Sequence, residues 1–187
     1  MFVENDRKGV EVGECLPDFC RADAVVMGCG NRLLGDDGFG PAVISYLKQC
    51  DGVPKGMALL DAGTGISRIL FDIALTPSKP GRLIVVDAMK LGLRAGSVSC
   101  VALDSFRSEQ AKVFSEHQEP TSCLLRELRD MRGIQVTLLV AEPGFTPDEV
   151  SPGLSPAMLD AVREAGELIR SGLAVGQDPT SSHNWND

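Results

Sequence analysis

The chain has 187 residues, of which 43% are hydrophobic and 24% are charged, as is usual for one soluble globular domain. Its formal net charge of −8 makes nucleic acid an unfavourable partner, because an acidic surface repels phosphate. No apolar run approaches the about 20 residues that span a bilayer, and the N-terminus lacks the apolar core of a secretory signal, so we expect a cytoplasmic protein without a membrane segment.

The six cysteines are scattered along the chain, and no two of them have C-x-x-C spacing. This spacing supports neither a zinc ribbon nor a thioredoxin motif, and we expect reduced thiols. We divide the chain into a polar lead-in at 1–22, one domain at 23–172 and a flexible polar tail at 173–187.

Short apolar runs alternate with segments of helical spacing throughout the predicted domain. Strands are predicted at 23–29, 57–61, 81–87, 97–103 and 134–141, and helices at 39–50, 67–75, 121–131 and 155–170. Pro41 fits the first turn of its helix, Thr121 and Ser155 are candidate N-caps, and Pro156 suits the first helical position. This order predicts an α/β fold, a single-domain three-layer sandwich with a mostly parallel five-stranded sheet and helices on both faces.

Acidic residues follow the first three predicted strands. Asp36 and Asp37 lie in the first loop, Asp61 ends the second strand, and Asp87 ends the third. The loops after parallel strands share one edge of the sheet, where the sites of such folds lie. Each aspartate alone is ordinarily a helix cap or a turn residue. Four at one edge need a further reason, since like charges raise one another's pKa unless a cation or hydrogen-bond donors compensate.

A histidine can reach the same edge. His117 follows the fourth predicted strand and precedes a helix, although a surface histidine is an equally good interpretation of this residue alone. Two carboxylates and one imidazole with open coordination positions suit a divalent transition metal. The other histidine, His183, lies in the polar tail and is not expected to take part.

Other kinds of site fit the sequence less well. The run GCGNRL after the first strand is similar to the dinucleotide-binding G-x-G-x-x-G, but Leu33 takes the third glycine position and acids stand where a pyrophosphate would sit. Asp61 falls where a ribose-binding acid is expected, so a Rossmann-like cofactor-binding module stays an alternative. Cys29 with His117 could form a reactive pair, but packing is the simpler interpretation of a cysteine at a buried strand end.

Four motifs occur in the order of a known family. They are GCGNRLLGDDGFG at 28–40, DAGTG at 61–65, IVVDA at 84–88 and HQ at 117–118. Together they resemble the hydrogenase maturation endopeptidases over about residues 23–172. The first motif most resembles the branch that serves deazaflavin-reducing hydrogenases of methanogens. The long lead-in, and the EPTS that follows HQ, depart from the usual pattern.

The resemblance implies a role for each matching residue. Asp37 matches the family's first metal-binding acid, Asp87 the second, and His117 the metal-binding histidine. Asp61 matches an acid whose role is less settled, and Asp36 is the neighbour of the first ligand. The general base is unassigned, with Asp36 and Asp61 as candidates by proximity.

The implied activity is cleavage of a C-terminal extension from the large-subunit precursor of a [NiFe] hydrogenase once nickel is in place. The implied metal is the nickel carried by the substrate, or another divalent transition metal in the isolated protein. Nickel would then polarise the scissile carbonyl or activate a water. We expect a monomer or weak dimer whose partner is the precursor. A nickel-binding assembly chaperone without proteolysis is the alternative that uses the same ligands.

Overall fold

The computed structural model describes residues 17–104 and 119–172. The predicted tail, most of the lead-in and both histidines lie outside the described residues. No helix of the described segments is long and apolar enough to cross a membrane.

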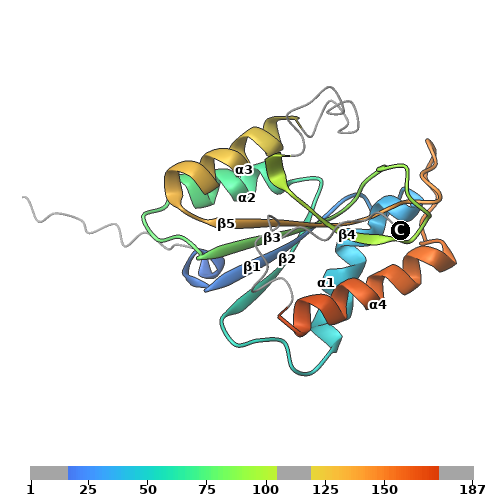
Figure 1. Ribbon diagram of the computed structural model, residues 1–187, viewed down its shortest axis with the longest axis horizontal. Coiled ribbons are helices and arrows are strands. Elements are labelled where there is room, and N and C mark those ends of the chain that lie inside the picture. The colour runs from blue at the N-terminus through green and yellow to red at the C-terminus, as the bar shows by residue number, and fades with distance from the viewer. Residues whose placement is uncertain (1–16, 105–118, 173–187) are drawn as a thin grey trace, which may run out of the picture.

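A five-stranded mixed sheet forms the centre of the domain (Figure 1). Its strands, in sheet order, are β2 (Met57–Gly63), β1 (Ala24–Cys29), β3 (Arg82–Ala88), β5 (Gln135–Ala141) and β4 (Val98–Val101). The first four run parallel, and β4 pairs antiparallel with β5 at one edge. The predicted mostly parallel five-stranded sheet is therefore confirmed, although its fourth strand is shorter than the sequence indicated.

Two pairs of helices cover the sheet and complete the three layers. In Figure 1, α2 (Ile66–Leu75) and α3 (Glu119–Arg132) lie on one face, and α1 (Phe39–Gln49) and α4 (Pro156–Arg170) lie on the other. Two short 3-10 helices, η1 (Asp18–Arg21) and η2 (Gly35–Gly38), precede β1 and α1. Helices on both faces explain why the strands are almost continuous apolar runs, because neither face of the sheet meets water.

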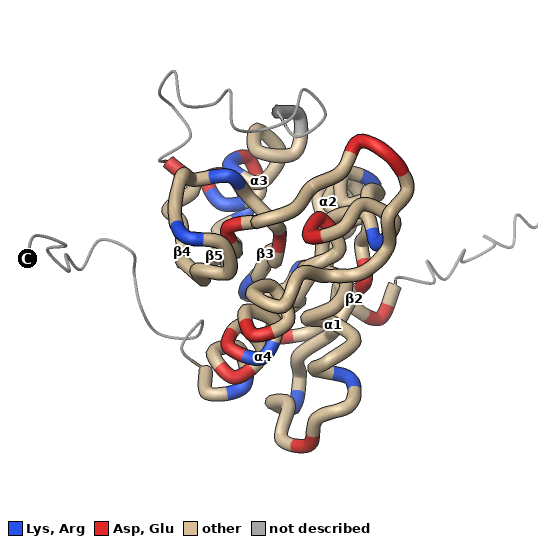
Figure 2. Tube along the Cα trace, turned by 90° about the vertical axis from the view of Figure 1, so that its right-hand side faces the viewer, with Lys and Arg blue, Asp and Glu red and all other residues tan. Residues whose placement is uncertain are grey.

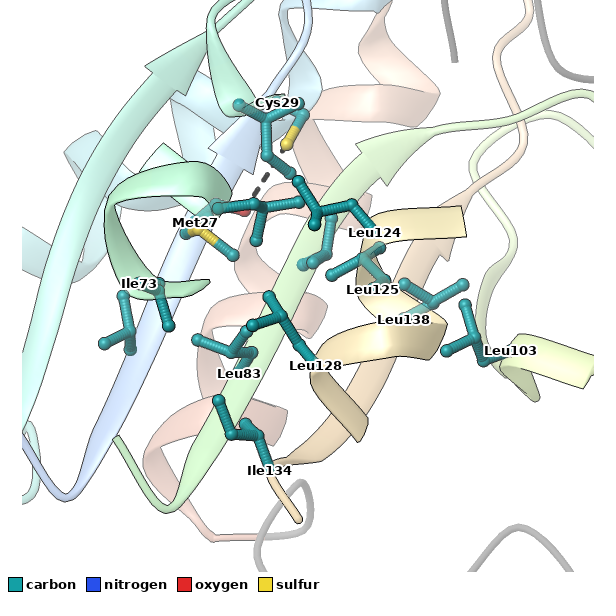
Figure 3. Packing of buried hydrophobic residues seen from close by; sticks show 14 of the residues in the cluster. Met27, Cys29, Ile73, Leu83, Leu103, Leu124, Leu125, Leu128, Ile134 and Leu138 are labelled. Atoms are coloured by element: carbon teal, nitrogen blue, oxygen red, sulfur yellow. Dashed lines mark hydrogen bonds between the residues drawn. The ribbon is translucent and has the colours of Figure 1, made fainter. Parts of the chain in front are cut away.

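Alternate residues of each strand belong to different cores. Met27, Val85 and Leu138 point toward α2 and α3, where they pack with Leu125 and Leu128 (Figure 3). Their strand neighbours, among them Val26, Ile84 and Leu139, pack against α1 and α4 in a second cluster. This alternation puts Cys29 and Asp87 on the α2–α3 face, since each lies two residues beyond a residue of that face.

The predicted helix starts are right at one position and wrong at another. Ser155 is the N-cap of α4, and its Oγ accepts the N–H of Met158 at 3.4 Å. Thr121 is not a cap, because α3 already begins at Glu119. The Thr121 hydroxyl instead lies 3.0 Å from the hydroxyl of Ser67, which joins α3 to α2.

The start of α1 lies directly on the strands. A Cβ added at Gly40 would overlap the carbonyl oxygens of Cys29 and Val86 and would lie 2.5 Å from the Cys29 nitrogen. Only a residue without a side chain permits this approach of helix and backbone. The approach holds η2, and with it Asp36 and Asp37, against the ends of β1 and β3.

We therefore expect Gly40→Ala to lower the free energy of unfolding by about 2–3 kcal/mol, because the backbone it meets cannot move aside as a side chain can. Gly65 is the matched control, since a Cβ there meets its nearest atom at an ordinary 3.4 Å. Gly65→Ala should cost less than about 1 kcal/mol as an N-cap change. Urea denaturation measures both, and equal midpoints for Gly40→Ala and wild type would contradict the close approach.

Candidate active site

The loops that follow the parallel strands gather at one end of the sheet. This end lies at the right of Figure 1 and faces the viewer in Figure 2. Asp37 lies in η2 after β1, and Asp87 is the penultimate residue of β3. The predicted common edge is confirmed for these two residues, which line the same cavity.

Asp37 and Asp87 form an acidic pair on the wall of this cavity. One oxygen of Asp37 accepts the N–H of Asn31 at 2.6 Å, and Oδ1 of Asp87 accepts the N–H of Ala88 at 2.9 Å. Burial and then the negative charge of Asp37 raise the pKa of Asp87 to about 7, against the lowering effect of the Ala88 N–H. The pair therefore favours a proton or a cation between its carboxylates.

The cavity has a volume of about 720 Å³ and lies on the α2–α3 side of the sheet. It is lined by the strand residues Cys29, Val85, Asp87, Leu138 and Val140, by the helix residues Ile66, Ser67, Thr121, Ser122 and Leu125, and by the loop residues Asn31, Leu34, Asp37, Thr146, Pro147 and Asp148, among others. One wall is thus acidic, while the helices contribute the hydroxyl groups of Ser67, Thr121 and Ser122 beside the apolar Ile66 and Leu125. Such a mixture suits an extended peptide better than a small ion alone.

Asp36 has a different role from its neighbour. Its side chain is fully buried, and it does not line the cavity. Its carboxylate accepts hydrogen bonds from the backbone of Gly144 at 2.9 Å, Phe145 at 2.8 Å and Ser155 at 2.7 Å, and from the Ser155 hydroxyl at 2.9 Å. These four bonds fasten η2 to the segment between β5 and α4. The predicted catalytic role of Asp36 gains no support from these surroundings.

Asp61 is turned toward the outside of the same edge. Its Oδ2 binds Arg32 through both Nη2, at 2.8 Å, and Nε, at 3.2 Å. Arg32 also donates to the Pro41 carbonyl and the Ser45 hydroxyl, so it joins β2 to the start of α1. Asp61 is more than one third exposed and does not line the cavity. The structure thus pairs it with a cation of the chain itself.

Cys29 lies beneath the acidic pair and lines the cavity. Burial raises the pKa of its thiol well above the ordinary value, and the charges of Asp87, Asp61 and Asp37 raise it further. The side chain therefore stays a thiol rather than a nucleophilic thiolate near neutral pH. Cys29 packs in the core, as the sequence indicated, with its Sγ 3.9 Å from the carbonyl of Met27 (Figure 3).

The third predicted metal ligand, His117, lies outside the described residues. Within residues 17–104 and 119–172, no group of three His, Cys, Asp or Glu side chains could hold a metal ion. Leu103 and Thr121, on either side of the segment that contains His117, both line the cavity. The metal-binding role of His117 stays a prediction.

Sequence patterns missed two residues that shape this edge. One is Arg32, which lies within the first motif but whose ion pair with Asp61, 29 residues along the chain, no sequence pattern indicates. The other is Glu142, a buried acid that accepts the N–H groups of Leu91 at 2.6 Å and Leu93 at 3.2 Å and so orders the loop after β3. Glu142 directly follows β5, so the rule that singled out Asp61 and Asp87 would also have found it.

Comparison with known proteins identifies relatives of this chain. Residues 41–171 match the hydrogenase maturation protease family, a range that includes Asp61, Asp87 and His117 and begins just after Asp37. A Methanocaldococcus jannaschii protein assigned to the hydrogenase maturation proteases is 32% identical over 80% of this chain and 95% of its own. The coenzyme F420 hydrogenase subunit delta of Methanothermobacter thermautotrophicus is 29% identical over 83% of this chain and 98% of its own.

Among solved structures, the hydrogenase maturating endopeptidase HybD of Escherichia coli is similar, with a TM-score of 0.64 and 25% identity. The similarity covers 81% of this chain and 91% of the HybD chain.

The buried hydrogen bonds of Asp36 predict a large loss of stability on substitution. Asp36→Ala leaves the N–H groups of Gly144, Phe145 and Ser155 without their acceptor, and we expect the free energy of unfolding to fall by at least about 3 kcal/mol. The free energy of unfolding of Asp36→Asn should lie between those of Asp36→Ala and wild type, because the amide oxygen still accepts hydrogen bonds but the amide nitrogen cannot. Asp61→Asn is the control, since its exposed ion pair contributes less than about 1 kcal/mol. Similar unfolding midpoints for Asp36→Ala and Asp61→Asn would refute the anchoring role.

The raised pKa of Asp87 predicts that the stability of the free protein depends on pH. This pKa is raised from 3.8 to about 7 on folding, so its contribution to stability is full below about pH 4 and is lost as pH rises to about 7. Asp87→Asn removes this loss. On going from about pH 5 to about pH 8, the free energy of unfolding of Asp87→Asn should therefore rise by about 2–3 kcal/mol relative to that of wild type.

Urea denaturation at the two pH values measures this difference. Asp37→Asn should weaken the pH dependence without abolishing it, because burial raises the pKa of Asp87 more than the charge of Asp37 does. A stability difference between Asp87→Asn and wild type that does not change with pH would exclude a raised pKa at Asp87.

Proposed function

Because this chain belongs to the hydrogenase maturation proteases, we propose that it removes the C-terminal extension of a [NiFe] hydrogenase large-subunit precursor after nickel has been inserted. The observation that carries this proposal is the acidic pair, Asp37 and Asp87, on the wall of a cavity of about 720 Å³. A cavity of this size accepts a stretch of polypeptide, and the two carboxylates attract a cation that the polypeptide brings with it.

We infer that the cation is the nickel of the substrate. Asp37 and Asp87 would each supply an oxygen ligand, and His117 would supply a nitrogen ligand. The raised pKa of Asp87 supports this role, because burial and the negative charge of Asp37 disfavour the ionised carboxyl, and a bound cation would offset that cost. Two carboxylates and one imidazole leave coordination positions open for the substrate's own ligands.

Nickel then acts as part of the substrate and polarises the scissile carbonyl or activates a water. The chain's contribution is to orient the metal and the peptide bond relative to one another, so that only a loaded precursor presents its bond correctly. This dependence on a metal brought by the substrate makes the protease a checkpoint for nickel insertion.

The acidic pair also supplies the best candidate for moving a proton. In the absence of a metal the pKa of Asp87 is raised to about 7, so this carboxyl can take up or release a proton near neutral pH before nickel binds, whereas as a nickel ligand it would be deprotonated. Asp36 and Asp61 are less suitable, since the first accepts four hydrogen bonds and the second is bound by Arg32. We therefore assign neither of them a direct role at the reacting atoms.

A cleavage assay on a nickel-loaded precursor tests these roles. We expect wild type to release one defined C-terminal peptide, detected by mass spectrometry. Asp37→Asn, Asp87→Asn and His117→Ala should each reduce kcat at least about 100-fold, because each removes a group that contacts the metal or the reacting atoms.

Asp61→Asn serves as the control within the same edge, and its kcat should stay within about tenfold of wild type. Loss of activity in Asp61→Asn equal to that in Asp87→Asn would contradict the assignment of the pair. A precursor that binds wild type but is never cut would favour the nickel-binding chaperone.

A further inference from the structure

Exposed apolar side chains are concentrated beside the cavity. In the described part of the chain, the large apolar residues that are exposed outside the α-helices all lie on loops at the carboxyl end of the sheet: Leu33, Leu93, Phe145 and Val150. Leu33 and Phe145 are about half exposed, at 51% and 50%, and Val150 is 71% exposed. Large apolar side chains held in water on loops commonly mark an interaction surface.

Hydrogen bonds hold three of these residues on one rigid support. The N–H of Ser151 donates to the carbonyl of Leu33 at 2.8 Å, and the N–H of Gly35 donates to the carbonyl of Ser151 at 2.9 Å. The carbonyl of Phe145 accepts the N–H of Asp36 at 2.9 Å, and the buried Asp36 carboxylate binds the Phe145 N–H. Leu33, Phe145 and Val150, which we call the rim patch, are thus displayed on backbone fastened to the core.

The rim patch is continuous with the cavity. Leu34 follows Leu33 and lines the cavity, and Thr146 to Asp148, between Phe145 and Val150, line it as well. In the parallel bridge of Leu34 with Ser151, the residues one position earlier are Leu33 and Val150, which therefore lie side by side. The rim patch therefore adjoins residues that line the cavity, within reach of the body of a protein whose tail lies in it.

We propose that the rim patch is the docking surface for the folded body of the precursor whose tail occupies the cavity. The inference rests on the proposed function, because the occupant is the same substrate. Each residue of an extended chain spans at most about 3.5 Å, so a short connection between the tail in the cavity and the folded body would place that body against the rim. An apolar patch there adds binding that the tail alone does not supply.

The matched experiment replaces three exposed apolar residues at each end of the molecule. The rim variant is Leu33→Ser, Phe145→Ser and Val150→Ser. The control is Phe71→Ser, Leu75→Ser and Met131→Ser, whose side chains are 55%, 82% and 76% exposed on α2 and α3. Each set removes one aromatic and two aliphatic side chains.

Steady-state cleavage of a nickel-loaded [NiFe] hydrogenase large-subunit precursor is the first readout. We expect the rim variant to raise KM at least about tenfold with kcat within about twofold of wild type, because docking contributes equally to the ground state and the transition state. The control should leave both constants within about twofold. An unchanged KM in the rim variant overturns the proposal.

Binding to the immobilised precursor separates failure of this inference from failure of the proposed function, since it needs no cleavage. The rim variant should bind at least about tenfold more weakly than the control, whether or not wild type cuts, and equal binding overturns the docking role. Val150→Ser alone, at the most exposed of the three positions, should weaken binding without lowering Tm. A fall in Tm would mean that another part of the same chain covers the rim patch. A change of molecular mass in light scattering would mean that a second copy of the chain covers it. Either result overturns the proposal.

Discussion

The buried carboxylate of Asp36 is the interaction on which the candidate site depends. It joins η2, which follows β1, to the segment that follows β5, although these elements lie more than 100 residues apart in the sequence. A charged group is stable there because four hydrogen bonds replace the water it has lost. The same bonds hold Asp37 at the cavity wall opposite Asp87 and fix the backbone that carries Phe145. The positions of both the acidic pair and the rim patch therefore depend on the buried carboxylate of Asp36.

The four aspartates of this edge differ in what neutralises them. Asp36 is compensated by backbone and hydroxyl donors, and Asp61 by Arg32. Asp37 and Asp87 line one cavity, where Asp37 accepts the N–H of Asn31 and Asp87 accepts that of Ala88, and burial followed by the charge of Asp37 raises the pKa of Asp87. A cation supplied from outside would lower that electrostatic cost. This electrostatic cost is the physical basis of the proposal that Asp37 and Asp87 bind a metal that the substrate carries.

Much of the fold was predictable because burial on both faces leaves a strong signal. The apolar run of β3, and the Ser155–Pro156 start of α4, were placed to within one residue. The common edge of Asp37 and Asp87 followed from the parallel sheet. Residue chemistry alone did not separate Asp36 from Asp37, because adjacent identical residues differ only in which direction η2 turns them, and only the resemblance singled out Asp37. The partners of Arg32 and Thr121 were equally hidden, since both are set by packing between distant elements rather than by local pattern.

Dependence of cleavage on nickel is tested by comparing one precursor in two states. Wild-type protein is incubated with the same large-subunit precursor, nickel-loaded in one sample and nickel-free in the other, and the released peptide is quantified by mass spectrometry. The account predicts release from the loaded precursor and none above background from the nickel-free form. Equal rates from both forms would contradict it, because Asp37 and Asp87 would then act without the metal that the account makes part of the substrate.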